Sequence, residues 1–212
     1  MKYLLILSCL LFTSVGWSKD VNINDLVLSN QDGLFYEKFT DTPFTGKVTG
    51  QKQGKISKGK KEGEWIWYYE NGQLSSKSNY KDGKEDGEWL WYHPNGQLQT
   101  KVNYKDGRED GEDLHYYASG QLQNKSNYID GKLEGEVLTY YDNGQLFSKK
   151  NHKYGKKEGE FLLYYENGQL WKKGNYKEDK QNGEWLYYKK NGQLQKTTIN
   201  KDGKLIKTLT HK

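Results

Sequence analysis

Residues 63–86 read GEWIWYYENGQLSSKSNYKDGKED, and this unit decides the fold because the chain repeats it. The tetrapeptide Asn-Gly-Gln-Leu, or a close variant, recurs with its glycine at 72, 96, 120, 144, 168 and 192. A Gly-Glu pair recurs with its glycine at 63, 87, 111, 135, 159 and 183, so both series advance by 24 residues without a slip. A fixed period of this length is typical of stacked supersecondary units.

Each unit has the pattern of a β-hairpin. Aromatic and β-branched residues fill the run 64–69, and a second β-prone run covers 73–80. Two such runs around Asn-Gly predict two antiparallel strands. We expect a three-residue loop over 70–72, with Gly72 in the left-handed region and a bulge at that residue.

This loop length predicts the register of the hairpin. It pairs Tyr68 with Leu74 and Ile66 with Ser76. The apolar residues Ile66, Tyr68 and Leu74 then lie on one face together with Tyr80. The columns of this face are uniform, with Ile or Leu first and Tyr two residues later in every unit. The repeat positions expected to be structural are Gly63, Tyr68, Gly72, Leu74, Tyr80, Gly87, Tyr92, Gly96 and Leu98.

The opposite face varies from unit to unit and is the candidate binding face. The same register places Trp65 and Trp67 there, with Trp65 opposite Lys77. A single layer leaves such side chains partly exposed, and a large exposed apolar strip marks a binding site. The competing interpretation is that the aromatics only form ladders and clamp lysine stems by cation–π contact. The candidate binding residues are Trp65, Trp67, Tyr69, Trp89, Trp91, Tyr117, Tyr141, Phe161, Tyr165, Trp171, Trp185 and Tyr187.

These patterns predict an all-β fold, an elongated single-layer antiparallel β-meander of stacked 24-residue hairpin repeats. The six repeats cover 63–206, and residues 207–212 are expected to form a C-terminal tail. Residues 19–62 are expected to form an N-terminal cap, with a strand at Leu34-Phe35-Tyr36. The cap includes a shortened repeat over 42–64, in which Gly46 and Gly54 take the glycine roles of the repeat.

The repeat carries a family resemblance. The spacing of Tyr80, Gly83, Gly87 and Trp89 resembles the MORN repeat, and the form GEWxxYYxNGQLxxKxNYKDGK resembles its bacterial variant in YwqK-family antitoxin proteins. The opening DGLFYEKFTDTPFTGKVTG (32–50) is also similar to that group. The resemblance implies single-layer hairpin arrays that contact proteins or lipids without catalysis, and the antitoxin name implies neutralising a toxin by binding.

Two residues depart from the family pattern. Asp179 stands where the other units have glycine, and it is expected to distort the connection between the fifth and sixth repeats. Asp113 replaces the usual aromatic residue of its column.

Composition agrees with a repeat built from Tyr, Trp and Gly. The chain has 212 residues, of which only 33% are hydrophobic and 29% charged, but 15% are aromatic. This composition excludes a large aliphatic core, and the aromatic content argues against disorder. The net charge of +5 comes from interleaved acids and bases, which argues against nucleic-acid binding.

The first 18 residues, MKYLLILSCLLFTSVGWS, have the pattern of a secretory signal peptide. Lys2 is followed by an apolar run over 3–12, and Gly16 and Ser18 are the small residues before the cleavage site. The alternative is a lipoprotein signal with Cys9 as the lipidated residue, but the apolar run before Cys9 is short. We therefore expect an exported protein, periplasmic or extracellular.

No catalytic, metal or cofactor site is expected. The four histidines, His93, His115, His152 and His211, do not have metal-ligand spacing. The Asp82-Gly83 turn and its copies supply too few oxygens for calcium. Glu64 and its copies sit in equivalent environments, whereas acid–base catalysis needs carboxylates in different ones.

Three classes of function remain after these exclusions. The first is a non-catalytic scaffold that binds a protein partner: a toxin, an envelope protein or a peptide. The second is a carbohydrate or cell-wall binder that uses an exposed Trp/Tyr face, and the third is a peripheral membrane binder. The sequence leaves open the identity of the partner and the oligomeric state.

Overall fold

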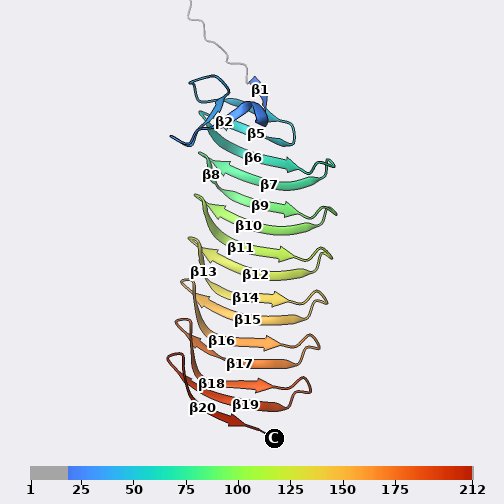
Figure 1. Cartoon of the computed structure of the whole chain (residues 1–212), viewed down its shortest axis with the longest axis vertical. Coiled ribbons are helices and arrows are strands. Elements are labelled where there is room, and N and C mark those ends of the chain that lie inside the picture. The colour runs from blue at the N-terminus through green and yellow to red at the C-terminus, as the bar shows by residue number, and fades with distance from the viewer. Residues whose placement is uncertain (1–18, 212) are drawn as a thin grey trace, which may run out of the picture.

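The computed structural model describes residues 19–211, and these form an elongated stack of β-hairpins (Figure 1). The predicted signal peptide lies outside the described residues. The repeats supply strands β6 (Lys60–Tyr68), β7 (Leu74–Lys81), β8 (Lys84–Glu85), β9 (Gly87–Tyr92), β10 (Leu98–Lys105), β11 (Arg108–Tyr116), β12 (Leu122–Ile129), β13 (Lys132–Leu133), β14 (Gly135–Tyr140), β15 (Leu146–Lys153), β16 (Lys156–Tyr164), β17 (Leu170–Lys177), β18 (Lys180–Tyr188), β19 (Leu194–Lys201) and β20 (Lys204–Thr210).

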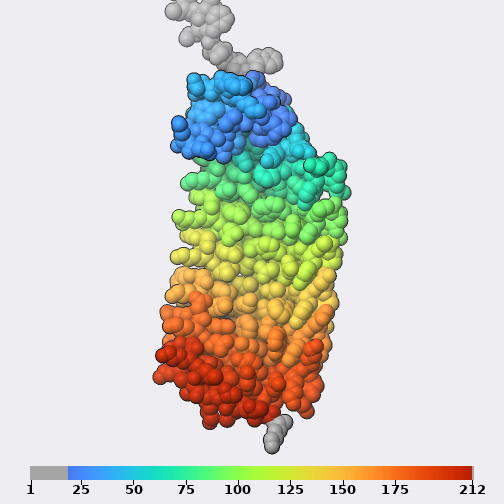
Figure 2. All heavy atoms as spheres, viewed as in Figure 1, coloured from blue at the N-terminus to red at the C-terminus, as the bar shows by residue number. Residues whose placement is uncertain are grey.

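The predicted all-β hairpin meander is confirmed. From β4 (Gly46–Thr49) and β5 (Lys52–Ser57) onward, the strands pair antiparallel in chain order as far as β20. The exceptions are β9 and β14, which pair with β7 and β12, because β8 and β13 are two-residue strands that pair with β7 and β12 as well. The Asn-Gly loops lie along one long side of the array and the shorter turns along the other (Figure 1). The repeats follow one another down the long axis in sequence order (Figure 2). Strand β20 continues to Thr210, through most of the segment expected to be a tail.

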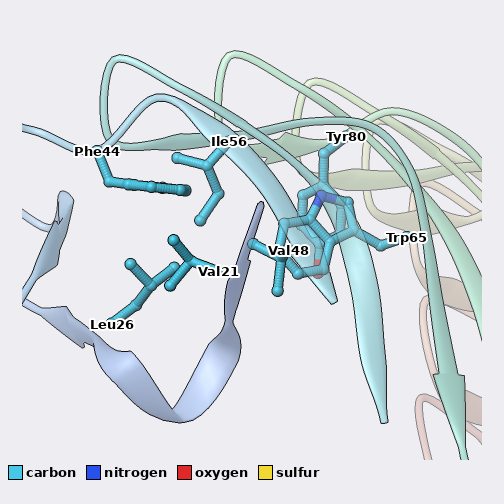
Figure 3. Packing of buried hydrophobic residues seen from close by; sticks show 7 residues of the cluster. All are labelled: Val21, Leu26, Phe44, Val48, Ile56, Trp65 and Tyr80. Atoms are coloured by element: carbon cyan, nitrogen blue, oxygen red, sulfur yellow. The ribbon is translucent and has the colours of Figure 1, made fainter. Parts of the chain in front are cut away.

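The cap closes the first end of the sheet. Strand β1 (Lys19–Asn22) pairs parallel with β4, and β2 (Leu26–Leu28) pairs with β3 (Phe35–Glu37) in a separate small sheet. The strand expected at Leu34-Phe35-Tyr36 therefore exists, shifted by one residue. The cap residues and the first repeat share one buried cluster (Figure 3), formed by Val21, Leu26, Phe44, Val48, Ile56, Trp65 and Tyr80.

The three-residue hairpin loop is confirmed. The Tyr69 N–H donates to the Gln73 carbonyl over 2.8 Å, and the Gly72 N–H donates to the Tyr69 carbonyl over 2.9 Å. Gly72 has φ = +84°, which is the left-handed conformation that the loop requires. Tyr68 pairs with Leu74 as predicted.

The predicted pairing beyond Leu74 is wrong, because a second bulge follows the loop. Trp67 pairs with Ser76, so Ser75 is an extra residue on the second strand. Because side chains alternate along a strand, this one-residue shift exchanges the two faces of everything after Ser75. Ile66 therefore lies opposite Lys77, not Ser76, and Trp65 lies opposite Ser78, not Lys77. Tyr80 consequently lies on the face of the tryptophans.

A wider irregularity bends the strands near the turns. Asp110, Gly111 and Glu112 of β11 lie opposite the single residue Asn103 of β10, and Gly111 has φ = +112°. Bulges of this kind bend the strand that carries them. The bend brings side chains from the turn side over the Trp65 column, as Lys61 shows, with Nζ 4.9 Å from the centroid of the Trp65 ring.

The assignment of a repeat-type glycine role to Gly54 is wrong. The turn glycine of the shortened repeat is Gly59, with φ = +76°, whereas Gly54 has no positive φ. A Cβ atom on Gly54 would lie 2.3 Å from the Trp65 ring, so this glycine provides space for that ring. Gly46 also provides space, because a Cβ there would lie 2.4 Å from the Lys19 carbonyl oxygen.

The distortion expected at Asp179 does not occur. Asp179 adopts φ = +65°, and its N–H donates to the Lys157 carbonyl over 3.0 Å, as the turn glycines of other repeats do. Its carboxylate also accepts the Lys157 N–H over 2.8 Å. Aspartate is one of the few residues that tolerate this conformation, because its short side chain bonds the nearby backbone.

Candidate binding faces

The register defines two faces of the sheet. The Trp face carries the columns of Trp65, Trp67, Ser76, Ser78 and Tyr80. The Tyr–Leu face carries the columns of Ile66, Tyr68, Leu74 and Lys77. The columns of the Trp face vary among repeats, as predicted, but much of this face is buried.

Several candidate binding residues lie in the interior of the Trp face. Trp65 is 1% exposed, Trp185 is fully buried, and Phe161 is 8% exposed. The expectation that this face stays open is therefore wrong for these residues, because bent strands and neighbouring repeats cover them. Trp67, Trp89, Trp91 and Tyr187 are partly exposed.

Glycine explains which tryptophans are fully buried. Gly54 and Gly174 stand in the column of Ser78, each next to a tryptophan of the following repeat. A Cβ atom on Gly174 would lie 2.2 Å from the Trp185 ring, and a Cβ atom on Gly54 would lie 2.3 Å from the Trp65 ring. Either atom would clash with the ring. Where that neighbour is Ser78, the next tryptophan, Trp89, stays partly exposed. Burial on this face thus depends on the size of a neighbouring side chain.

Another group of candidate residues links one repeat to the next. The hydroxyl of Tyr69 donates to the Tyr92 carbonyl over 2.6 Å. The tyrosines that repeat this bond to the carbonyl of the next repeat are Tyr117, Tyr141 and Tyr165, over 2.8 Å, 2.9 Å and 2.9 Å. The sixth repeat, which no further repeat follows in this chain, has Lys189 in this column. These tyrosines add a side-chain bond between repeats to the backbone pairing of their strands.

Lysines occupy the Trp face at its two ends. Lys61 Nζ lies 4.9 Å, 5.3 Å and 4.5 Å from the ring centroids of Trp65, Trp67 and Tyr80. Burial lowers the pKa of Lys61 and raises the pKa of Tyr80 to about 12. At the other end, Lys172 Nζ lies 4.5 Å from the Trp185 ring. Cation–π contacts of lysines with the aromatics of this face, the competing interpretation, therefore occur at both ends, whereas Lys77 lies on the Tyr–Leu face opposite Ile66.

The middle of the Trp face is acidic. Asp113 is 5% exposed, and its Oδ2 accepts a hydrogen bond from Ser126 Oγ over 3.2 Å. His115 Nε2 lies 2.9 Å from Asp113 Oδ1, and this contact raises the pKa of His115. Burial raises the pKa of Glu109, and the charge of Asp113 raises it further. These residues line an open cavity of about 360 Å³ with Trp91, Thr100, Val102 and Tyr104.

The Tyr–Leu face is the more open of the two. Every residue in its Ile66, Tyr68 and Leu74 columns is partly exposed, in all six repeats. Ion pairs within the hairpins border the apolar columns in the first four repeats, namely Lys77–Glu64, Lys101–Glu88, Lys125–Glu112 and Lys149–Glu136. Sequence reasoning assigned this face a structural role, and the structure adds that its apolar columns are partly exposed.

Trp171 is the most exposed of the candidate aromatics. It is 41% exposed and stacks on Tyr165, with ring centroids 5.3 Å apart and ring planes at 22°. In the preceding repeat the equivalent pair, Tyr141 and Phe147, makes an edge contact instead, with ring centroids 5.1 Å apart and ring planes at 73°.

The described residues contain no group of three or more His, Cys, Asp or Glu side chains that could hold a metal ion. The Asp82–Gly83 turn also has a structural explanation, because the Asp82 N–H donates to the Glu62 carboxylate over 3.0 Å. Within residues 19–211, no helix is long and apolar enough to cross a membrane.

The fold and the repeated columns define a β-hairpin repeat array. The model of the MORN repeat variant matches six consecutive segments: 61–82, 85–106, 109–130, 133–154, 157–178 and 181–200. The chain therefore belongs to the MORN repeat variant family. MORN repeats are generally non-catalytic and are consistent with a scaffold for interactions.

No curated protein matches the chain. Among solved structures, the chain is similar to a chain of the crystal structure of a GtfA/B complex bound to UDP and GlcNAc, at 16% identity and a TM-score of 0.17. The match covers 63% of this chain and 24% of that chain.

Proposed function

We propose that the chain is an exported, non-catalytic scaffold that binds a protein partner through the Tyr–Leu face. The observation that carries the proposal is the continuous strip of partly exposed Tyr and Leu columns along all six repeats. Protein interfaces combine an apolar centre rich in tyrosine with a polar rim. Here the ion pairs that begin with Lys77–Glu64 supply such a rim.

The regular spacing of the strip favours an elongated partner surface. Equivalent residues of successive repeats are two strands apart, about 10 Å along the array. A toxin neutralised by binding is the specific partner that the resemblance to YwqK-family proteins supports, and an envelope protein or peptide would use the same contacts.

The test is capture of a partner by wild-type protein and by two matched variants. Leu122→Lys with Leu194→Lys places two charges in the apolar strip. Gln123→Lys with Gln195→Lys places the same charges one residue further along the same strands, at the bulge position. We expect cross-linked partners from the native envelope with wild type and with the Gln pair, but not with the Leu pair. Far-UV circular dichroism checks that each variant is folded.

Equal capture by both variants would move the site away from the Tyr–Leu face. Export is tested separately by mass spectrometry of the protein recovered from its native cell, where we expect Lys19 or a near neighbour at the N-terminus. A diacylglyceryl mass on Cys9 would instead make the protein a lipoprotein.

One observation supports carbohydrate binding as a second candidate function. The stacked pair Trp171 and Tyr165 is a partly exposed aromatic platform of the kind on which sugars stack. We expect no binding to isolated cell-wall polysaccharide if the protein is a protein-binding scaffold. Retention by the polysaccharide that Trp171→Ala abolishes would favour the carbohydrate alternative.

A further inference from the structure

The charges of the Trp face are segregated by repeat. The column two residues before each Gly-Glu pair holds Lys61, Glu85, Glu109, Leu133, Lys157 and Gln181 in order. Lys61 and Lys157 lie over aromatic rings of this face, 4.9 Å from Trp65 and 5.2 Å from Tyr176. In the second and third repeats, an acid takes the place of this lysine.

Among the described residues, no lysine or arginine lies over the aromatic rings of this middle region. Within residues 19–211, the rings that receive a lysine lie at or before Tyr80 or at or after Tyr154. Trp89, Trp91 and Tyr104 lie between them and pack on one another, with centroids 5.2 Å and 5.1 Å apart. They form an electron-rich wall, which attracts cations.

A cavity opens beside this wall. Its volume is about 360 Å³, and Trp91, Tyr104, Glu109, Asp113 and His115 contribute to its lining. We call it the acidic pocket. Pockets that bind small groups begin at about 300 Å³ and combine apolar walls with a few polar groups.

The floor of the acidic pocket holds a buried carboxylate that is only partly satisfied. Asp113 is 5% exposed, and its Oδ2 accepts a hydrogen bond from Ser126 Oγ. Within the described residues its Oδ1 has no regular hydrogen bond and faces His115, with Nε2 at 2.9 Å and a side chain that is 41% exposed. Glu109 adds a second carboxylate to the same lining, so one histidine faces two acids, and a buried carboxylate is costly unless cations pair with it.

We propose that the acidic pocket binds a lysine or arginine side chain presented by a protein partner. The ammonium or guanidinium group pairs with Asp113 and Glu109, and its alkyl stem lies against Trp91 and Tyr104. The first repeat provides the precedent, because there Lys61 of the chain occupies the corresponding place among Trp65, Trp67 and Tyr80. The pocket is on the Trp face, so this proposal does not depend on the Tyr–Leu face.

The test is titration of the chain with a capped lysyl pentapeptide, followed by the indole N–H signal of Trp91 and by calorimetry. Two variants of adjacent residues make a matched pair. Asp113→Asn removes the charge at the floor of the pocket, and Glu112→Gln removes the same charge on the Tyr–Leu face, where Glu112 pairs with Lys125. We expect Asp113→Asn to weaken binding at least about tenfold, as loss of a buried charge partner does. Glu112→Gln should leave the affinity within about twofold.

Two further ligands test whether the pocket recognises a lysine side chain of a peptide or any free amine. A pentapeptide with norleucine in place of lysine keeps the alkyl stem and should not shift the Trp91 signal. Butylammonium supplies the same charge without a peptide and should bind more weakly than the lysyl peptide. If it binds as tightly, the pocket is a site for free amines and the protein-partner assignment is wrong.

The proposal is overturned if the lysyl peptide fails to shift the Trp91 signal at millimolar concentration. It is also overturned if Asp113→Asn and Glu112→Gln weaken binding equally, because the peptide then responds to the net charge of the protein and not to the acidic pocket. Glu109→Gln is the second pocket variant and should weaken binding in the same direction, so the result does not depend on one substitution being well folded. Capture of a partner through the Tyr–Leu face is scored separately and can fail while the peptide still binds.

Discussion

Replacing Gly174 by alanine should destabilise the protein because a large ring already occupies the space of a Cβ atom. The added atom would lie 2.2 Å from Trp185 Cδ2, whereas ordinary contacts begin at 3.4 Å, so the ring must retreat by about 1.2 Å. Trp185 is fully buried and has little room to move. Overpacking of this kind costs about 1–3 kcal/mol. Reduced freedom of the unfolded chain returns about 0.5–1 kcal/mol, so we expect the net loss to lie between about 0 and 2.5 kcal/mol.

The assay is urea unfolding followed by far-UV circular dichroism, arranged as a double-mutant cycle. Trp185→Leu removes the ring that blocks the Cβ atom. In that background, Gly174→Ala should be neutral or slightly stabilising, which gives a coupling of about 1–3 kcal/mol. A coupling near zero, or stabilisation by Gly174→Ala alone, would refute the idea that glycine provides space here. Gly54→Ala, which faces Trp65, should repeat the result at the other end of the array.

Gly72→Val should lower the melting temperature more than Ser75→Val, because Gly72 has φ = +84° while Ser75 is a strand residue; equal shifts would contradict the loop assignment. Tyr165→Phe should cost about 1 kcal/mol by removing one hydrogen bond between repeats, measured by urea unfolding, and a neutral result would make that bond incidental. The raised pKa of His115 gives a stability contribution that is full below its unfolded pKa and lost as pH rises through its folded pKa. The lowered pKa of His152 acts in the opposite direction, so the measured quantity is the difference in unfolding free energy between wild type and Asp113→Asn. The advantage of wild type should shrink as pH rises above the ordinary histidine pKa of about 6.5, and parallel profiles would rule out the pairing.

The sequence alone predicts the hairpin stack because its signals are local. Asn-Gly followed by Gln-Leu specifies a loop whose glycine needs a positive φ, and that requirement does not depend on the rest of the molecule. The 24-residue spacing then places each hairpin beside the next one. For the same reason, the pairing of Tyr68 with Leu74 could be predicted.

The exposure of each face was decided by the tertiary structure. A bulge at Ser75 needs no special residue, so the sequence carries no signal for it, yet it moves Tyr80 to the Trp face and leaves the Tyr–Leu face open. The extent to which a tryptophan is buried depends on the size of a residue in the preceding repeat. Trp185 is fully buried because its neighbour there, Gly174, has no side chain. Asp113 was visible in the sequence as a break in an aromatic column. Only the structure shows that Asp113 and Glu109 line the same pocket, because the bend of β11 brings them together. The burial and the electrostatic environment of a residue depend on its neighbours in space, which the sequence does not specify.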